Sequence, residues 1–453
     1  MAKPPYRASV LFYGDDFTGA ADNAAQYARH GLQTRLFFHH PGIAALQEAA
    51  DQCDVVGIAG TARSLHPEDM REELLPVLQA FAKLKIPWVQ YKCCSTFDSA
   101  AHTGSLGYAI RLMKEVWPDC FVPVHSAAPE FGRYTLFGHH FARAGSEIYL
   151  LDKHPVMSVH PVTPMHESEL SKVLSTQGFQ TDYLLDVRQL DQYQTDPELL
   201  TNKLASLHSA VVDGYTQQQV VTAAAALWQL SQQRQVCAMA AQGLAHGLGQ
   251  HLRESHSTQL QTPKQQLLPT DRLLVLSGSC SALSAAQIDH AEQTGFVCLR
   301  LSNDALLQTH DALLDAVLNL MLKALSAGQS VVVFTAHGPH DAHTKALREQ
   351  THHWPAGQLT QRIGTCFAKL ADTAFKHTGL TRLVVAGGDS SSFTMRALGA
   401  EALQIKASHF TQNAHFAELV SAKAHIHGKE VLLKGGQVGN EQLYRLALDG
   451  FDH

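Results

Sequence analysis

The feature that most constrains the fold of this 453-residue chain is the alternation of short apolar runs with segments of helical periodicity. Each apolar run is only a few residues long and ends in glycine or a polar side chain, as buried strands do. Strands that alternate with helices form parallel sheets. The sequence therefore predicts an α/β protein with largely parallel, doubly wound sheets, whose strands lie near residues 8–13, 32–38, 54–60, 87–93, 121–127, 183–188, 210–214, 272–279, 296–302, 331–336 and 382–389.

The length of the chain exceeds what one ordinary hydrophobic core can use, so we expect two domains. Residues 256–271 are polar, rich in glutamine and contain two prolines, a composition typical of a linker. We therefore predict an N-terminal domain at 1–255, a linker at 256–271 and a C-terminal domain at 272–453.

The composition excludes several classes of protein. Hydrophobic residues make up 45% and charged residues 17% of the chain, which is typical of a compact globular protein. A net charge of -6 argues against a general nucleic-acid surface, and no run of about 20 apolar residues could span a membrane. The eight cysteines form no CxxC pair, which argues against a disulfide framework or a zinc site. We expect a cytoplasmic protein whose partner is a small molecule, and a homo-oligomer is left open.

The first candidate site lies where the first strand ends. In parallel α/β sheets ligands bind beyond the carboxyl ends of the strands. Asp15 and Asp16 occupy this position, and Thr18 and Gly19 open the next helix, whose free N–H groups and positive dipole end would face an anion. One carboxylate could accept a proton from a hydroxyl while the other orients ligand or solvent. An ordinary Asp/Thr helix cap is the alternative interpretation.

Further candidates follow other strands of the first domain. Arg63 follows strand 54–60 and could pair bidentately with a substrate carboxylate. Arg133 lies between Gly132 and Tyr134 in an expected tight turn, where it could close over a ligand or only belong to a hairpin. The mixture of cation, hydroxyl and carboxylate after strand 87–93 suggests polyol recognition by Lys92, Ser95, Thr96 and Asp98.

Three glycine- and serine-rich loops end strands of the second domain. Paired glycines let the backbone approach a phosphate closely, and a following helix offers free N–H donors. No GxxxxGK[ST] sequence is present, and each loop alone could be a plain turn. Together they predict a nucleotide site formed by Ser277, Gly278, Ser279, Gly387, Gly388, Asp389, Ser390, Gly435 and Gly436.

Taken in order, six motifs of the chain resemble those of the four-carbon acid sugar kinase family: GDDFTGAAD (14–22), TARS (61–64), KCCSTFDS (92–99), SGSCS (277–281), GGDSS (387–391) and KGGQVG (434–439). The resemblance implies an N-terminal sugar-acid-binding domain, a C-terminal ATP-binding domain, and transfer of the γ-phosphate to a tetronate such as threonate, erythronate or 3-oxo-tetronate. Ser390 replaces the family's usual threonine and keeps the hydroxyl. MSVHPVTPM (157–165) and FGRYTLFG (131–138) indicate a separate branch, so the acceptor could be a close, branched analogue.

The resemblance also suggests roles for the candidate residues. Asp16 would take the proton from the attacking hydroxyl, with Asp98 as the competing base, while Arg63, Lys92 and Ser95 hold the acid. Mg²⁺ would bridge the phosphates of ATP, because phosphoryl transfer depends mainly on positioning and charge neutralisation. The active site would then lie in the cleft between the two domains. Two other classes stay open, namely a non-catalytic sugar-acid sensor and a divalent-metal hydrolase that uses Asp15 and Asp16.

Overall fold

The computed structural model describes residues 7–255, 266–307, 312–355 and 357–452. By internal contacts the chain divides into two compact units, Met1–Pro263 and Lys264–His453. Of the predicted linker, residues 256–265 lie outside the described residues, and the remainder includes the short strand β12 (Gln266–Leu267). The predicted domain boundaries themselves stay a prediction.

The main sheet of the first unit is parallel throughout its described strands, in the order β2-β3-β1-β4-β11-β5-β10-β9. The central strands β1, β4 and β11 are buried along their whole length, as expected for a sheet covered on both faces. Their bounds are β1 Val10–Gly14, β2 Thr34–Phe37, β3 Val55–Ala59, β4 Trp88–Lys92, β5 Val122–His125, β9 Leu184–Leu185, β10 Ser209–Val212 and β11 Val236–Ala240.

Helices connect these strands as crossovers, so the carboxyl ends of the strands share one edge of the sheet. The helices are α1 Phe17–Ala28, α2 Ile43–Gln52, α3 Pro67–Leu84, α4 Leu106–Val116, α5 Leu170–Thr176, α6 Val187–Gln192, α7 Pro197–Leu204, α8 Gln217–Ser231 and α9 Gln242–Ser255. Short 3₁₀ turns occur at Ala62–Ser64, Pro129–Phe131, Leu151–Lys153 and Met157–Val159.

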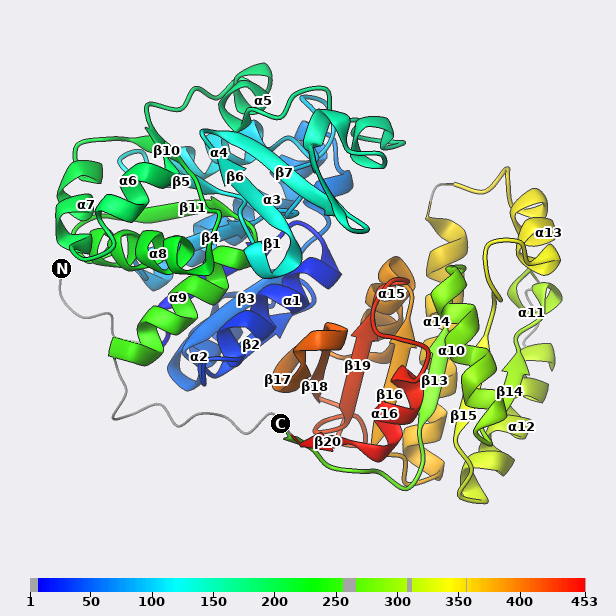
Figure 1. The fold of residues 1–453 in the computed structure, drawn as a ribbon. Helices are drawn as coiled ribbons and strands as arrows, with labels where there is room; N and C mark the ends of the chain where they lie inside the picture. The colour runs from blue at the N-terminus through cyan, green and yellow to red at the C-terminus, as the bar shows by residue number, and fades with distance from the viewer. Residues whose placement is uncertain (1–6, 256–265, 308–311, 356, 453) are drawn as a thin grey trace. The chain divides into compact units, whose positions relative to one another are not determined.

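A separate antiparallel sheet lies between β5 and α5 in the sequence. It consists of β6 (Arg133–Leu136), β7 (His139–Ala144) and β8 (Glu147–Leu150), paired in that order. Figure 1 shows β6 and β7 as neighbouring ribbons of the first unit. The sequence did not predict this sheet, because its strands are short and half-exposed and lack a continuous apolar run.

The second unit has strand order β14-β15-β13-β16-β19-β18-β17, and Figure 1 shows β18, β19, β16, β13, β15 and β14 side by side. The first five strands of this order are parallel, whereas β18 runs antiparallel to both β19 and β17. Their bounds are β13 Leu274–Ser277, β14 Val297–Arg300, β15 Val331–Phe334, β16 Arg382–Ala386, β17 Ala402–His409, β18 Ala414–Val420 and β19 Glu430–Lys434, and β12 pairs with β20 (Phe451–Asp452).

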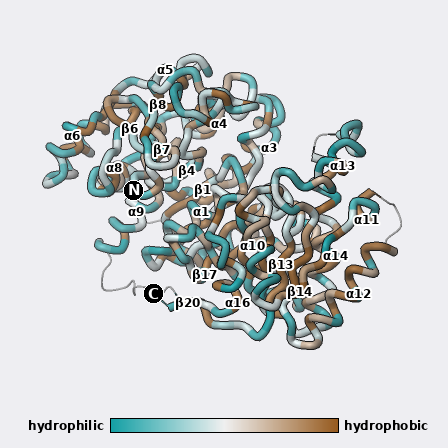
Figure 2. The backbone as a smooth tube through the Cα atoms, turned by 45° about the vertical axis from the view of Figure 1, so that its right-hand side comes forward, coloured by the Kyte–Doolittle hydropathy of each residue, from teal (hydrophilic) through white to brown (hydrophobic). Residues whose placement is uncertain are grey.

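The core of the second unit packs the central strands against helices on the sheet. Val275, Val384 and Leu432 from neighbouring strands contact a cluster that includes Ile288 of α10 and Leu443 of α16. Figure 2 shows the hydrophobic colouring concentrated on the inner strands and on α12. The helices are α10 Ala282–Gln293, α11 Asn303–Leu307, α12 Ala312–Ser326, α13 Ala342–Gln350, α14 Gln358–His377, α15 Gly388–Leu398 and α16 Leu443–Asp449, with a 3₁₀ turn at Phe410–Gln412.

The predicted fold class, α/β with largely parallel sheets, is confirmed. The predicted strand at 183–188 is shortened to two residues, because Asp186 caps α6 through a capping box with Gln189. Among the described residues no helix is both long and apolar enough to cross a membrane.

Candidate active site

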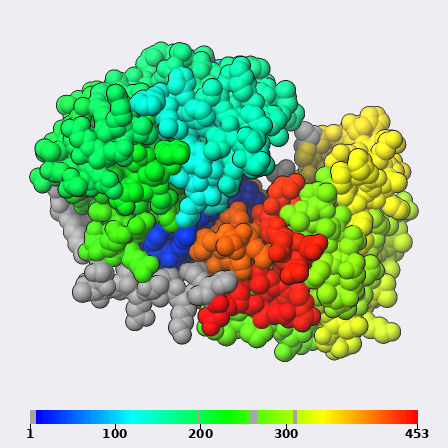
Figure 3. All heavy atoms as spheres, in the orientation of Figure 1, coloured from blue at the N-terminus to red at the C-terminus, as the bar shows by residue number. Residues whose placement is uncertain are grey.

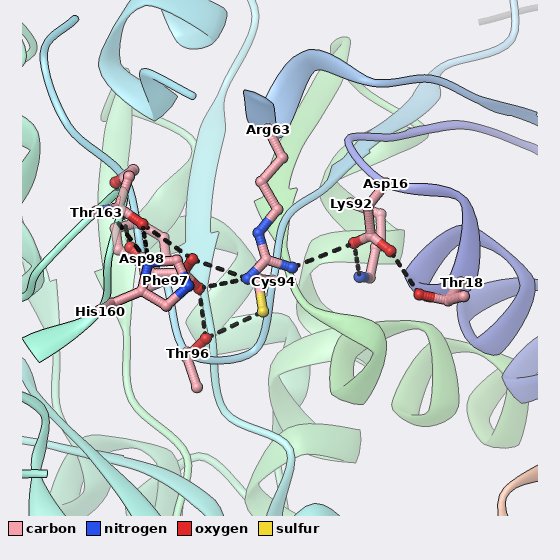
Figure 4. Close-up of polar contacts among 11 residues, drawn as sticks. Asp16, Thr18, Arg63, Lys92, Cys94, Thr96, Phe97, Asp98, His160 and Thr163 are labelled. Atoms are coloured by element: carbon pink, nitrogen blue, oxygen red, sulfur yellow. Dashed lines mark hydrogen bonds and ion pairs between the residues drawn. The ribbon is translucent and has the colours of Figure 1, made fainter. Parts of the chain in front are cut away.

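Asp16 links the end of β1 to the beginning of α1. It is the N-cap of the helix, and its Oδ1 accepts hydrogen bonds from the Gly19 N–H at 2.6 Å and the Thr18 hydroxyl at 2.9 Å. Its Oδ2 lies 3.6 Å from the Lys92 Nζ and 3.8 Å from a guanidinium nitrogen of Arg63. The helix-cap interpretation is therefore correct, and the second oxygen of the same carboxylate faces two cations (Figure 4).

Gly19 makes room for this arrangement. A Cβ atom at this position would lie 2.0 Å from the Lys92 Nζ and 2.6 Å from the Asp16 Oδ2. Any larger residue would push the ammonium group away from the carboxylate. Gly19 of the GDDFTGAAD motif is thus required for steric reasons, and its N–H also donates a hydrogen bond to Asp16.

The turn at residues 61–64 positions Arg63. Glu73 of α3 accepts hydrogen bonds from the N–H of Thr61 at 2.6 Å and from its hydroxyl at 2.5 Å. The backbone N–H of Arg63 donates to the carbonyl of Asp15 at 3.1 Å, which ties this turn to the end of β1. The turn is therefore held to α3 by hydrogen bonds to a side chain and to the end of β1 by a backbone hydrogen bond.

Arg63 also pairs with Asp98. One guanidinium nitrogen donates to both carboxylate oxygens of Asp98, at 2.8 and 3.0 Å. The same carboxylate accepts hydrogen bonds from the hydroxyls of Thr96 at 2.5 Å and Thr163 at 3.3 Å (Figure 4). Thr163 was not among the predicted residues, because it lies in an irregular part of the MSVHPVTPM segment, after the 3₁₀ turn Met157–Val159, and follows no strand end.

The loop that carries Ser95 and Thr96 is fixed from outside the main sheet. The carbonyl of Ser95 accepts a hydrogen bond from the Nε2 of His140 at 2.8 Å, and the Nδ1 of His140 pairs with the Thr135 hydroxyl at 2.9 Å. Burial lowers the pKa of His140 to about 4, so this imidazole is neutral near pH 7. Sequence reasoning missed His140 because the adjacent pair His139 and His140 has no spacing typical of a functional motif.

The carboxylates of the site differ in their protonation. Burial alone would raise the pKa of Asp16, but Lys92, the Gly19 N–H and Arg63 outweigh it and hold this pKa at about 2. Burial also acts to raise the pKa of Asp98, yet Arg63 and Thr96 leave it below its usual value. Asp15, which is 2% exposed, has its pKa raised to about 7 by burial despite the charge of Lys92. Asp16 and Asp98 are thus ionised at neutral pH, whereas Asp15 titrates there.

Replacing Asp15 by asparagine is expected to change the pH dependence of stability. Between pH 4 and 7 the unfolded carboxyl, with its usual pKa of 3.8, is ionised while the folded one still holds its proton. The folded state then binds more protons, so the wild-type free energy of unfolding falls as the pH rises through this window. Asparagine cannot ionise, so the variant should gain about 2 to 4 kcal/mol over wild type between pH 4 and pH 8.

Denaturant unfolding at several pH values checks this expectation. The comparison between the two proteins isolates Asp15, because the other titrating groups are common to both. Parallel curves for wild type and Asp15→Asn from pH 4 to 8 would show that Asp15 does not titrate in this window.

Arg133 begins β6, immediately after Gly132, which has a left-handed φ of +67°. One of its guanidinium nitrogens donates to the carbonyl oxygens of Phe131 at 2.9 Å and Gly132 at 3.3 Å. The structure therefore places Arg133 at the start of a hairpin. Its expected contact with a ligand stays a prediction.

The three predicted loops of the second unit come together. The Ser281 hydroxyl donates to the carbonyl of Gly436 at 2.6 Å, and the Gly387 N–H donates to the carbonyl of Lys434 at 2.9 Å. A Cβ on Gly278 would lie 2.9 Å from the Ser390 Oγ, so the first and second loops are also in contact. Ser277, Ser279 and Gly435 lie in the same three loops, and the backbone of Asp389 lies in the first turn of α15.

Gly387 and Gly388 meet different surroundings. Gly387 has a φ of +128°, and a Cβ on it would lie 2.3 Å from the Ser390 Oγ. Gly388 begins α15, and apart from its chain neighbours and the backbone of α15 itself, a Cβ on it would have no heavy atom of the described residues within 4 Å. The first glycine is needed by the loop itself, whereas the second leaves the beginning of the helix open on one side.

Lys434, at the end of β19, adds a buried cation beside these loops. Its Nζ donates to the Ser284 hydroxyl at 3.3 Å, and burial lowers its pKa to about 8. Among the described residues no group of three or more His, Cys, Asp or Glu side chains could hold a metal ion.

Two models of known protein domains match the chain, one in each of its two units. Residues 10–248 match the model of a sugar-binding N-terminal domain, and residues 274–444 match that of a nucleotide-binding C-terminal domain. Two solved structures share the fold at 23% identity: one from Haemophilus influenzae, with a TM-score of 0.74 over 96% of this chain and 98% of that one, and one from Salmonella typhimurium LT2, with 0.78 over 97% and 98%.

Relatives of known activity extend the comparison. The chain is 31% identical to a 3-oxo-isoapionate kinase of Paraburkholderia graminis over 97% of this chain and 94% of the relative. It is 27% identical to a 3-oxo-tetronate kinase of Cupriavidus necator, over 96% and 95%, and 29% identical to one of Pseudomonas fluorescens, over 87% and 86%.

Fold, motifs and relatives together define the class of protein as a sugar-acid kinase. The chain belongs to the four-carbon acid sugar kinase family. The resemblance to this family that the motifs indicated is thereby confirmed. The predicted enzyme class, an ATP-dependent phosphotransferase that acts on a sugar acid, is confirmed at the level of the family.

Proposed function

We propose that this chain transfers the γ-phosphate of ATP to a hydroxyl of a four-carbon 3-oxo acid or of a close, branched analogue. The observation that carries the proposal is the ionised Asp16 carboxylate, held at the end of β1 with one oxygen facing Lys92 and Arg63. Carboxylates and cations at the carboxyl ends of parallel strands are what recognition and activation of a polyhydroxy acid require.

Asp16 is a better candidate than Asp98 for the group that accepts the hydroxyl proton. The Asp98 side chain is 1% exposed, and both of its oxygens are already used by Arg63, Thr96 and Thr163. The Asp16 side chain is 23% exposed, and among the described residues its Oδ2 has only the two longer ion pairs. In this proposal Asp98 positions Arg63, and Asp16 orients the attacking hydroxyl and takes its proton.

Lys92 and Arg63 would then hold substrate oxygens near Asp16. The side chain of Lys92 is almost fully buried, and Asp16 and Asp15 raise its pKa above the usual range although burial acts to lower it. A permanently charged ammonium at this point can bind a substrate hydroxyl and stabilise negative charge that develops on the acceptor oxygen. Ser95, Thr96, Thr18 and Gly19 supply further polar groups on the same two loops.

The loops around Gly278, Gly388 and Gly436 would bind the phosphates of ATP. Free N–H groups at the beginning of α15 and the ammonium of Lys434 favour an anion there. Mg²⁺ is held mainly by nucleotide phosphates, water and one or two protein oxygens, so the serine hydroxyls of these loops fit such an ion without a preformed cage. When bound, the ion would neutralise charge on the transferring phosphate.

The choice of acceptor rests on relatives that act on 3-oxo acids. The 3-oxo-isoapionate kinase and the 3-oxo-tetronate kinases cover most of the chain at similar identity, so both acids belong in the test. Full-length protein is incubated with Mg-ATP and each of 3-oxo-isoapionate, 3-oxo-tetronates, threonate and erythronate, while ADP release is followed. We expect ADP release that depends on one of the 3-oxo acids.

This panel of acids, together with a phosphate ester as a further substrate, separates the kinase function from its alternatives. Acid binding without ADP release from any member would indicate a sensor and contradict the kinase proposal. Phosphate release from a phosphate ester without ATP, lost on addition of EDTA, would indicate a metal-dependent hydrolase.

A further inference from the structure

The cations near the candidate acid site are not all neutralised by the protein. Arg63 pairs with Asp98 and lies near Asp16, and Lys92 lies near Asp16 as well. Arg133 differs from both, because its hydrogen bonds within the described chain go to two backbone carbonyls, and its Nε is buried without a hydrogen-bond partner. No ion pair joins Arg133 to an Asp or Glu of the described residues.

A half-buried guanidinium without a counter-ion is costly. Burial lowers the pKa of Arg133, with the nearby charge of Arg143 acting in the same direction. Removing one partner of a buried ion pair typically costs several kcal/mol, since the remaining charge is desolvated without compensation. A planar guanidinium also matches a carboxylate in two parallel hydrogen bonds. An external carboxylate would therefore compensate Arg133 in a way that the chain itself does not.

Arg133 lies beside the loop that follows Lys92. β6 pairs with β7 so that Thr135, two residues after Arg133, lies opposite His140. The Nε2 of His140 lies 2.8 Å from the carbonyl oxygen of Ser95, which ties this end of the antiparallel sheet to that loop. Figure 3 shows the segment that contains β6 and β7, coloured cyan to teal, at the surface of the first unit. Arg133 is thus close to the candidate site but outside its internal ion pairs.

We propose that Arg133 binds the carboxylate of the sugar acid, which leaves Arg63 and Lys92 to the hydroxyl and oxo groups. This inference rests on the proposed function and extends it by assigning a specificity-determining residue. It also gives the antiparallel sheet β6–β8 a role, because its first residue distinguishes a sugar acid from a neutral polyol. The acid group and the reacting hydroxyl would bind to different cations of the same site.

The test compares acids with their uncharged primary amides in three full-length proteins: wild type, Arg133→Gln and Arg143→Gln. The probes are 3-oxo-tetronate, 3-oxo-isoapionate, threonate and erythronate with the corresponding amides. Arg143 is an exposed residue of β7, so its variant is a control for the loss of one nearby positive charge. Wild type and Arg143→Gln should prefer acid over amide by about 100-fold in kcat/KM.

Arg133→Gln should lose about 10- to 100-fold in kcat/KM for the acid, mainly through KM, and change by less than about threefold for the amide. Equal losses for acid and amide would show a structural role and overturn the assignment, as would a wild type that does not prefer the acid. Calorimetry without ATP tests Arg133 separately from catalysis. Acid binding by wild type and Arg143→Gln but not by Arg133→Gln supports the assignment even if no phosphate is transferred, whereas unchanged binding by Arg133→Gln contradicts it.

Discussion

Replacing Asp16 by asparagine is expected to lower kcat by about 10²- to 10⁴-fold, the usual contribution of a general base. The amide oxygen can still accept the Gly19 N–H and so preserve the beginning of α1, but it can neither take a proton nor face Lys92 as an anion. ATP affinity should change by less than about threefold, because the nucleotide loops belong to the second unit. Steady-state ADP release and a nucleotide-binding titration measure the two effects.

Two further variants test whether the loss of kcat is specific to the Asp16 carboxylate. Thr18→Ala removes a hydrogen bond to the Asp16 Oδ1 but leaves the carboxylate, so its loss in kcat should be below about tenfold. Asp98→Asn weakens the partner of Arg63 and should mainly raise KM for the acid. If Asp16→Asn kept full turnover while Asp98→Asn lost it, the proton acceptor would be Asp98.

Replacing Gly388 by alanine is expected to weaken ATP binding by about tenfold or more without lowering the stability of the protein. Apart from the chain neighbours and the backbone of α15 itself, a Cβ at this position meets no heavy atom of the described residues within 4 Å, and alanine is favourable near the beginning of a helix. The same methyl group would occupy the open side of α15 where we place a phosphate. Thermal unfolding without nucleotide and an ATP titration measure the two properties.

Gly387→Ala is the matched comparison. Its Cβ would lie 2.3 Å from the Ser390 Oγ, and its φ of +128° is unfavourable for alanine. This variant should lose both stability and ATP affinity. ATP binding by Gly388→Ala that equals wild type would place the phosphates away from the beginning of α15.

The parts of the fold that could be predicted from the sequence are those with a strong periodic signal. Buried strands such as β1 and β3 are short runs of mainly apolar residues, and the helices between the strands are amphipathic. β11 was missed although it is fully buried, because VCAMA is short and follows a polar stretch directly. β17 and β18 were missed because their antiparallel pairing depends on partners that no local pattern indicates.

The candidate site shows the same division. The ends of parallel strands share one edge of the sheet, so Asp16, Arg63 and Lys92 could each be predicted as candidates from their places after strands. Their grouping into one site followed from the family resemblance. Hydrogen bonds from outside that edge could not be predicted. Thr163 and His140 reach the 92–98 loop from irregular or half-exposed segments, and only tertiary packing shows the contacts.

Transfer of a phosphoryl group from ATP to a sugar acid can be followed directly by ³¹P NMR of a complete reaction. Wild-type protein, Mg-ATP and each acid of the panel are followed until ATP is consumed, with Asp16→Asn as the control. With one of the 3-oxo acids, we expect the γ-phosphate signal to be replaced by that of a phosphomonoester on the acid, in amounts equal to the ADP formed. ADP that appears together with inorganic phosphate alone, or no consumption of ATP with any acid, would contradict it.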